Sequence, residues 1–423
     1  MVPDHPSPRP IAVDLYAGAG GLSLGMEQAG FDVLVAVESD PIHALTHKWN
    51  FPQTNVLASD ATTIRGSDIL AAASGAWDKR NPLTPFPGQI DAVVGGPPCQ
   101  GFSVGGVRRV GDDRNQQLLN FVRLVVELRP RVFALENVAG LLEGRFDPLR
   151  SRAFHELAEA GYTMSGQSRT VNAADFGVPQ NRRRLVVLGS LSSSAPILVE
   201  AGSKSYVSDA LEGLPDIRSY RRLLRADSAA LNEGDQAAMQ SIEGDYARTL
   251  HGLSIDAGDF ADARIWDPSI LSNSLRTVHT ARTIARFART PNGKAEPVSR
   301  LYRLEPGSPA RTLRAGTGSD GGSHTSPRPI HPVYNRVITV REAARIHSFP
   351  DWFRFHATNW HGHRQVGNSV PPLLGRAIGS ALLSKLDREP QTGSGAQSLG
   401  DLDWLGLNSS ESLKVLGSLD GNA

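Results

Sequence analysis

The chain has 423 residues, of which 40% are apolar and 21% charged, and its formal net charge is +1. These values are those of an ordinary globular protein with room for one large domain and a smaller second one, and the overall charge gives no sign of a nucleic-acid partner. The single cysteine, Cys99, excludes a disulfide within the chain and a cysteine-rich zinc site.

The first 190 residues alternate short apolar runs with longer helical patterns. Four runs predict buried parallel strands, at Ile11–Tyr16, Val33–Val37, Ile90–Val94 and Val132–Leu135. The segments between and after them predict helices, at Leu22–Ala29, Pro41–Trp49, Gln116–Leu128 and Arg150–Ala160. A further strand is expected at Arg184–Leu188. This alternation predicts an α/β fold with a doubly wound sheet.

From about residue 190 to 330 this rhythm stops, and we expect a second domain with little regular structure. Within it, Arg276–Arg314 carries nine Lys or Arg residues and two acids, which could follow a phosphate backbone or simply form a solvated face. A capping box predicts a helix at Thr339–Ser348, and another helix follows Pro371–Pro372. Beyond Pro390 the chain is rich in Ser and Gly and is expected to be flexible, although its leucine runs, at Leu402–Leu407 and Leu413–Leu416, could dock.

The residues that could bind a ligand or take part in a reaction follow the predicted strands. In a parallel sheet the residues after each strand meet at one edge, where open α/β folds bind ligands. Here these residues are a glycine-rich turn after the first strand, Glu38 after the second, Gly95–Cys99 after the third and Glu136 after the fourth. Glycines, two carboxylates and a thiol are therefore expected together.

The glycine-rich turn, Asp14–Gly21, follows a strand and opens a helix. Its spacing departs from a dinucleotide-binding motif at Ser23, and Glu38 is placed to accept hydrogen bonds from ribose hydroxyls. A nucleoside cofactor without a pyrophosphate, such as S-adenosylmethionine, would tolerate that departure. The alternative is a structural turn without a ligand.

The cysteine lies in Gly96-Pro-Pro-Cys-Gln-Gly-Phe-Ser103. Two prolines restrict the backbone before Cys99 and favour a thiol presented at the sheet edge, whereas the alternative is an inert buried cysteine. The glycines and arginines that follow, up to Arg114, predict a loop that could close over a polyanion, or one that is merely floppy.

Three further motifs predict little about function when each is taken alone. Glu136-Asn-Val could supply an acid or a hydrogen-bond donor, or only cap a helix. Gln180-Asn-Arg-Arg-Arg184 precedes a strand; if residues 163–170 and 184–188 form a hairpin, its arginines could hold a carbonyl or phosphate, or form a surface cluster. Gln365–Pro372 indicates a turn into a helix.

Taken together and in this order, the motifs resemble the DNA (cytosine-5) methyltransferase family. The resemblance rests on Asp14–Gly21, Pro98-Cys99-Gln100, Glu136–Val138, Gln180–Arg184, Thr312-Leu313, Arg341–Arg345 and Gly367–Val370. It covers residues 11–380 except for 190–310, where the chain offers no template.

The resemblance implies a Rossmann-like methyltransferase sheet that binds S-adenosylmethionine. It implies that a thiolate at Cys99 attacks carbon 6 of a flipped cytosine, that Glu136 holds or protonates N3, that Arg184 contacts the base carbonyl, and that Arg182 contacts neighbouring backbone or loop. These four residues are the expected catalytic set. The implied cofactor-binding set is Tyr16, Gly18, Gly20, Gly21, Glu38, Asp60, Pro98, Asn368 and Ser369. Gln100 and Ser103 would face DNA, and no metal is expected.

The resemblance also gives a domain plan and partners. A catalytic domain at 1–192, completed by 362–388, would face a recognition domain at 193–361, with a flexible tail at 389–423. The expected partner is duplex DNA, and a restriction endonuclease acting on the same site is a possible second one. The single cysteine, the lack of a signal sequence and the lack of an 18-residue apolar run favour a cytoplasmic bacterial enzyme.

The same residues bear on three other functions. An RNA methyltransferase with a second catalytic cysteine is excluded by the cysteine count, whereas one built on the DNA-type scaffold stays open. A catalytically dead DNA-binding regulator is disfavoured by the intact Cys99, Glu136 and Arg184. A nicotinamide-dependent dehydrogenase is disfavoured by Ser23 and by the Pro-Pro-Cys sequence.

Overall fold

A computed structural model describes residues 8–98, 116–167, 169–200, 203–316, 328–393 and 395–420. Cys99, Gln100 and Ser103, to which the sequence analysis gave roles, lie outside these residues. None of the helices in the described ranges is both long and apolar enough to cross a bilayer.

An eight-stranded sheet forms the centre of the molecule, in the order β3-β2-β1-β4-β5-β9-β6, with β7 also pairing with β9. The strands are β1 (Ile11–Leu15), β2 (Asp32–Val37), β3 (Asn55–Leu57), β4 (Ala92–Gly95), β5 (Val132–Val138), β6 (Thr163–Ser165), β7 (Thr170–Asn172) and β9 (Arg183–Ser190). Strands β1 to β5 are parallel, and β9 runs antiparallel to β5. The five predicted strands are confirmed, and β3 is added to them. Strands β6 and β7 pair antiparallel with β9, so they form with it the hairpin considered for residues 163–170 and 184–188.

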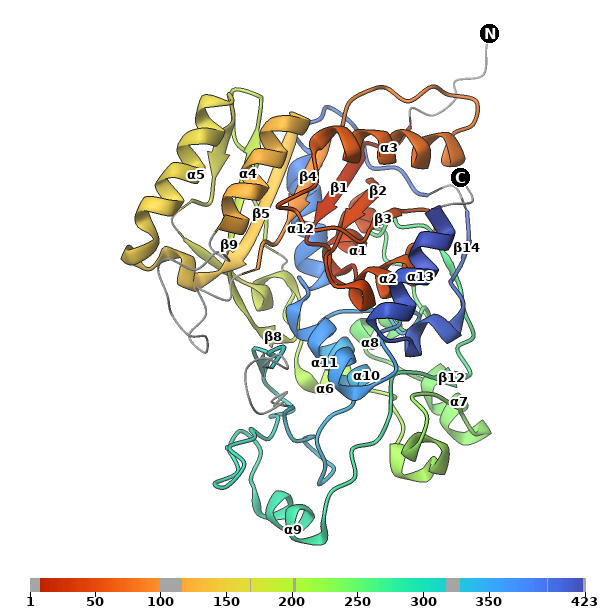
Figure 1. The fold of residues 1–423 in the computed structure, drawn as a ribbon. Coiled ribbons are helices and arrows are strands. Elements are labelled where there is room, and N and C mark those ends of the chain that lie inside the picture. The colour runs from red at the N-terminus through yellow and green to blue at the C-terminus, as the bar shows by residue number, and fades with distance from the viewer. Residues whose placement is uncertain are drawn as a thin grey trace.

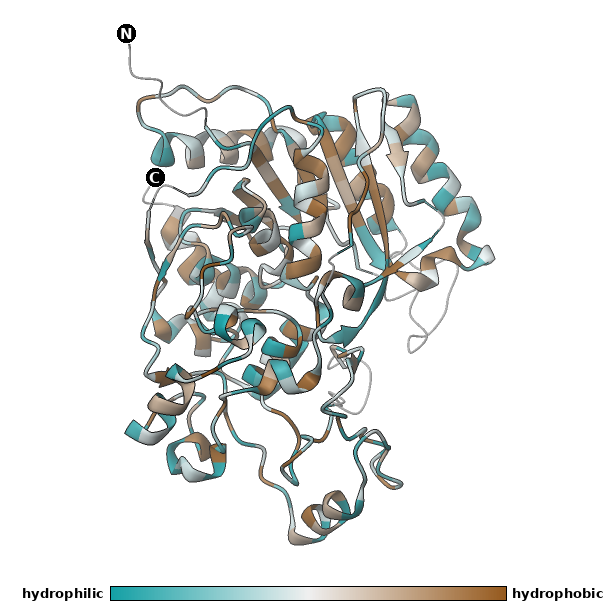
Figure 2. Cartoon of the chain, turned by 180° about the vertical axis from the view of Figure 1, so that it is seen from behind, coloured by the Kyte–Doolittle hydropathy of each residue, from teal (hydrophilic) through white to brown (hydrophobic). Residues whose placement is uncertain are grey.

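Helices cover both faces of this sheet, and its strands are the hydrophobic layer between them (Figure 2). One face packs against α3 (Gly66–Arg80), α4 (Gln116–Leu128) and α5 (Asp147–Glu159). The other packs against α1 (Gly21–Gln28) and α12 (Pro372–Leu383), which contact each other closely. The helix predicted after Pro371–Pro372 therefore lies on the sheet beside the first helix of the chain (Figure 1).

The segment between β9 and α12 contains short elements. Its helices are α6 (Val207–Leu211), α7 (Glu233–Gln240), α8 (Asp245–Leu250), α9 (Ala281–Arg289), α10 (Val340–Ile346) and α11 (Asn359–Asn368). Three two-stranded sheets join β10 (Ala229–Ala230) to β12 (Ile270–Leu271), β11 (Arg264–Ile265) to β14 (Gln397–Ser398), and β13 (Ala310–Arg311) to β8 (Gln180–Asn181). Helix α9 lies at the opposite end of the molecule from α3 (Figure 1).

Helix α10 connects this segment to the glycine-rich turn and α1 through shared apolar contacts. Its predicted capping box is confirmed, because the Thr339 hydroxyl accepts from the Glu342 amide at 3.2 Å and the Thr339 amide donates to the Glu342 carboxylate at 2.7 Å. Residues from 304 to 366 share one apolar cluster with Ala19, Leu24 and Phe51. The glycine-rich turn is therefore supported by residues from both parts of the chain, and the domain boundaries stay a prediction.

The prediction of a flexible tail at 389–423 is wrong for the described residues. The tail forms β14, a 3-10 turn at Leu402–Gly406 and helix α13 (Ser409–Asp420), which packs against α2 (Pro41–Asn50). Trp404, Leu407 and Leu416 join an apolar cluster with residues of α2 and the neighbouring strands. The two leucine runs do dock, because α2 leaves an apolar face that they cover.

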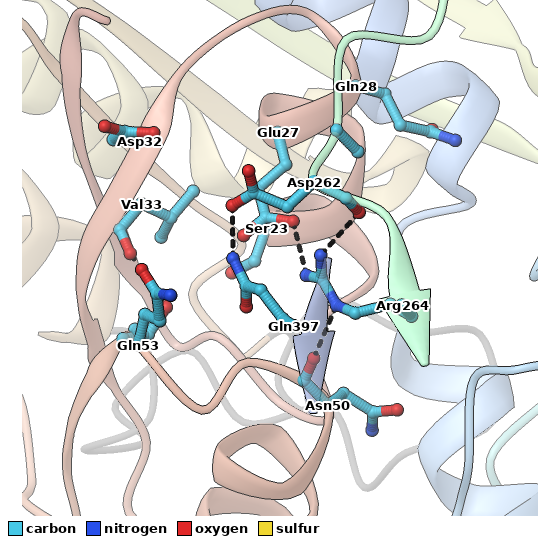
Figure 3. A network of polar contacts seen from close by, with 12 residues as sticks. Ser23, Glu27, Gln28, Asp32, Val33, Asn50, Gln53, Asp262, Arg264 and Gln397 are labelled. Carbon is cyan, nitrogen blue, oxygen red and sulfur yellow. Dashed lines mark hydrogen bonds and ion pairs between the residues drawn. The ribbon is translucent and has the colours of Figure 1, made fainter. Parts of the chain in front are cut away.

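Buried ion pairs and hydrogen bonds connect the middle segment and the tail to helices of the first part of the chain (Figure 3). The Arg264 guanidinium donates to the Glu27 carboxylate at 2.6 Å and to the Asn50 carbonyl at 3.2 Å. Asp262 accepts from Arg80 at 2.8 Å and from the Gln397 amide. These contacts place residues 262–264 and 397 beside α1, α2 and α3, where an unpaired charge would be costly.

Candidate active site

The glycine-rich turn after β1 needs glycine at two positions for different reasons. Gly18 has a φ of 57°, and a β-carbon added there would meet no atom within 4 Å, so this side of the turn is open. Gly20 has a φ of 107°, and a β-carbon there would lie 2.3 Å from the Phe51 ring and 3.1 Å from the His47 ring. Tyr16 is also left-handed, at φ 60°, a conformation that tyrosine rarely adopts outside functional sites.

Glu38 and Asp60 lie around the open side of this turn. The Glu38 carboxylate accepts the Gly18 amide and the Asp40 amide, both at 2.8 Å, so its oxygens are held at the end of β2. Burial, and then the charge of Asp60, raise the pKa of Tyr16, whose hydroxyl donates to the Gln117 carbonyl at 3.0 Å. Asp60 itself is exposed. The arrangement offers carboxylates to the hydroxyls and amines of a nucleoside.

Ser23, where the motif departs from a dinucleotide fingerprint, belongs to a buried triad of polar groups. Its hydroxyl donates to the Asp14 carboxylate at 2.6 Å and lies 2.9 Å from His47 Nε2. Burial raises the pKa of Asp14 to about 7 and lowers the pKa of His47 to about 3. The triad therefore ties β1, α1 and α2 together beneath the turn while the histidine is neutral.

Glu136 and Arg184 come together at the same edge of the sheet. They lie at the ends of the antiparallel strands β5 and β9, and Arg184 Nε is 2.7 Å from Glu136 Oε1. A β-carbon added to Gly96 would lie 3.0 Å from Glu136 Oε2, and the Asn137 side-chain NH₂ group donates to the Pro97 carbonyl at 3.2 Å. The backbone that leads to Cys99 is thus held against Glu136-Asn137, and Pro98 is exposed beyond it.

Arg182 lies apart from the open edge. Its side chain is buried, and its guanidinium donates to the carbonyls of Leu313 at 3.2 Å, Gly367 at 3.0 Å and Ser369 at 3.0 Å. These hydrogen bonds hold Arg182 against the backbone of two distant segments, and its place in the catalytic set stays a prediction.

The late motif lies beside the glycine-rich turn. A β-carbon added to Gly21 would lie 2.4 Å from the Val370 carbonyl and 3.0 Å from the Ser369 β-carbon, so only glycine permits this approach. Asn368, at the end of α11, is exposed next to this contact. The structure thus brings Asn368 and Ser369 to Gly21, although 346 residues or more separate them in sequence.

Several residues of this region belong to no motif that the sequence reveals. His47, Gln117 and His347 received no role, although each forms a hydrogen bond that supports the turns described above. A helical pattern could mark them only as inward-facing residues, since their partners come from distant segments. Within the described ranges, no group of three or more His, Asp, Glu or Cys residues could hold a metal ion.

Known proteins resemble this chain over most of its length. A family model described as C-5 cytosine-specific DNA methylase matches residues 12–384. The Type II methyltransferase M.XorII of Xanthomonas oryzae pv. oryzae is 44% identical over 410 residues, which cover 97% of this chain and 93% of the relative. M.AgeI of Thalassovita gelatinovora is 30% identical over 441 residues, covering 88% of this chain and 98% of that protein.

Solved structures share the fold. A DNA modification methyltransferase encoded within a prophage (E. coli) superposes with a TM-score of 0.70 at 32% identity, covering 90% of this chain and all of that one. The S. pombe Dnmt2 methyltransferase, at 15% identity and a TM-score of 0.52, shares the fold alone. The chain therefore belongs to the C-5 cytosine-specific DNA methylase family and is a DNA (cytosine-5) methyltransferase.

Proposed function

We propose that the enzyme transfers a methyl group from S-adenosylmethionine to carbon 5 of cytosine at a specific site in duplex DNA. The reaction would use a covalent bond between Cys99 and carbon 6 of a base rotated out of the helix. The observation that carries this proposal is that the Glu136–Arg184 pair and the Gly18–Glu38 turn occupy the same edge of one sheet.

The glycine-rich turn fits the nucleoside part of this donor. The space beside Gly18 is open, and the Glu38 carboxylate is already oriented by two backbone amides, which leaves lone pairs for ribose hydroxyls. Tyr16, Gly20, Gly21 and Asp60 would complete the nucleoside site, with Pro98, Asn368 and Ser369 at the methionine end. S-adenosylmethionine would supply an electrophilic methyl group.

Carbon 5 of cytosine is a weak nucleophile, and the residues that face the base would activate it. A thiolate at Cys99 would add to carbon 6, and the electron pair of the 5,6 double bond would become available at carbon 5. Glu136 would hold N3 and Arg184 the base carbonyl, where charge changes during addition. Loss of the carbon 5 proton after methylation would restore the double bond and release Cys99. Because carbon 6 is stacked inside a duplex, the base must leave the helix.

The recognition segment offers a basic helix to the DNA backbone. Arg282, Arg286 and Arg289 recur on α9 at intervals of four and three residues and so share one side of the helix. Arg282 and Arg289 are exposed, and neither has an ion-pair or hydrogen-bond partner among the described residues. Phe287 anchors the helix in a small cluster with Ile330. Cations without a protein partner are suited to phosphates.

Other cations of the Arg276–Arg314 stretch serve the fold. Arg303 is buried and donates to the carbonyls of Phe287 and Thr290, at 2.6 Å and 3.1 Å. The Arg311 guanidinium lies 3.8 Å from the centre of the Tyr302 ring. Arg303 and Arg311 therefore have partners within the chain, and we assign phosphate contacts to the arginines of α9 instead of to these two. Gln100 and Ser103 would face DNA from the loop after Cys99.

The biological setting follows from the relatives. M.XorII and M.AgeI are named Type II methyltransferases, which supports a role in protecting a recognition site from an endonuclease that cuts the same sequence. The substrate would then be the DNA of a bacterial nucleoid in the cytoplasm.

Methylation of a plasmid followed by bisulfite sequencing tests the proposal. We expect protected cytosines within one short sequence, only when the chain is expressed and Cys99 is intact. Methylation scattered without a common sequence would contradict site specificity. Methylated RNA with unmodified plasmid would overturn the assignment of duplex DNA as the substrate.

A further inference from the structure

A buried hydrogen-bond network connects the hairpin that carries Arg184 to the turn that touches Gly21. Gln180, at 0% exposure, lies on β8, two residues before Arg182, and His347, also at 0%, follows α10. The Gln180 side-chain nitrogen lies 2.9 Å from His347 Nδ1, and His347 Nε2 lies 2.9 Å from the Ser369 carbonyl. Three segments far apart in sequence therefore meet at one imidazole.

The direction of every hydrogen bond in this network follows from one backbone amide. The Leu313 amide can only donate, and it does so to the Gln180 side-chain oxygen at 3.1 Å. The Gln180 NH₂ group must then face His347, so Nδ1 of the ring has to accept. A neutral imidazole that accepts at Nδ1 carries its proton on Nε2, and this N–H donates to the Ser369 carbonyl.

The surroundings favour this neutral form. Arg182 donates to the same Ser369 carbonyl at 3.0 Å, so a cation already lies beside the ring. Burial lowers the pKa of His347 well below 6.5, and the charges of Arg182 and then Arg184 add to the effect. A second proton on the ring would also face the Gln180 NH₂ group, where no acceptor is present unless the Leu313 bond is given up.

The Ser369 carbonyl is a point of contact between two sites. Residues 369–370 press against Gly21 of the glycine-rich turn, and Arg182 belongs to the same hairpin as Arg184, which pairs with Glu136. A shift of the Ser369 carbonyl would therefore displace residues of both the glycine-rich turn and the Arg184 hairpin.

We propose that His347, as the Nε2–H tautomer, is a positioning residue that holds the Ser369 turn in register between the glycine-rich turn and the Arg184 hairpin. The inference rests on the proposed function, in which Asn368 and Ser369 line the methionine end of the cofactor. The inference means that His347, which is not one of the reacting groups, contributes to the affinity for the cofactor.

Two substitutions of His347 separate this role from packing. His347→Gln retains a donor near the position of Nε2 and an acceptor, whereas His347→Leu retains the volume and has neither. His331→Leu is the matched control, because His331 is another buried histidine that accepts backbone amides, from Val333 and Tyr334 at 3.0 Å. Binding of S-adenosylmethionine to the full chain is measured by calorimetry below the melting temperature of every variant.

We expect His347→Leu to weaken cofactor binding at least tenfold, His347→Gln less than threefold, and His331→Leu less than twofold even if it unfolds at a lower temperature. Equal affinities for the wild type and His347→Leu, or equal losses in His347→Leu and His331→Leu, would overturn the inference. A wild type that binds no S-adenosylmethionine would instead overturn the proposed function.

The tautomer is tested separately, so that a variant that fails to fold does not decide the question. In the full chain with ¹⁵N-labelled histidine, we expect one Nε2–H ring that does not titrate between pH 5.5 and 8 and whose signals are missing in His347→Gln. Assignment of that missing signal to an Nδ1–H or doubly protonated ring would overturn the inference whether or not cofactor binds.

Discussion

Arg184 Nε and Glu136 Oε1 lie 2.7 Å apart across two antiparallel strands, in a register that pairs Arg184 with Val138. Both side chains are 11% exposed, so the pair is held in a largely dry environment yet reaches the surface. In the proposed function, this pairing would orient both side chains toward the N3 and carbonyl edge of cytosine before the base arrives.

Removing either member of this pair should slow methyl transfer. We expect Glu136→Gln and Arg184→Gln each to lower the single-turnover rate by roughly 100-fold, since one preorganised contact contributes about 3 kcal/mol to the barrier. The double variant should lose far less than the product of the two, because each single change already leaves its partner misaligned. If the loss of rate in the double variant equals the product of the two single losses, the two residues are not coupled.

The two glycines with positive φ in the first turn should respond differently to alanine. Gly18→Ala places a methyl group in open space, so we expect a loss of about 1–2 kcal/mol in unfolding free energy from its positive φ, with cofactor affinity falling more than tenfold. Gly20→Ala pushes into the Phe51 ring, so its main effect should be on unfolding. Urea denaturation and cofactor titration on both variants distinguish the two. Unchanged cofactor affinity in Gly18→Ala would mean that the open space does not receive the nucleoside.

Helix α9 should contribute phosphate contacts. For Arg282→Ala combined with Arg289→Ala, we expect weaker DNA binding and a plot of log affinity against log salt that is shallower by about 2, or about 1 for each lost contact. Arg152→Ala with Arg388→Ala is the control, since both are exposed arginines outside the recognition segment. The same slope in both double variants would contradict a backbone contact at α9.

Asp14 should make stability depend on pH. Its pKa is raised from 3.8 to about 7, so the folded state holds a proton that the unfolded chain releases, and this stabilisation, on the order of 4 kcal/mol, is lost as the pH rises from about 4 to 7. The difference in unfolding free energy between the wild type and Asp14→Asn should therefore shift against the wild type from pH 5 to pH 7 and stay constant above that. Parallel curves throughout would show that Asp14 is ionised in the fold.

The central sheet was predictable because its strands are continuous apolar runs with punctuating glycines and polar ends. Glu38, Glu136 and Arg184 were found for the same reason: residues at strand ends share one edge. Strand β3 was missed because three residues give too short a pattern, and His347 because its partners, Gln180 and Ser369, are brought close only by tertiary packing. The tail was read as flexible from its Ser and Gly content, whereas its leucines cover an apolar face of α2 that the sequence of the tail does not reveal.

The most direct test is to trap the enzyme on DNA in which 5-fluorocytosine replaces cytosine throughout, so that the target sequence need not be known. Fluorine cannot leave as the carbon 5 proton does, so the thiolate cannot be released. We predict a complex that survives denaturing electrophoresis, requires S-adenosylmethionine, and is absent for Cys99→Ser. A trapped complex of equal yield with Cys99→Ser, or methylated plasmid from that variant, would show that the sulfur of Cys99 does not carry the reaction.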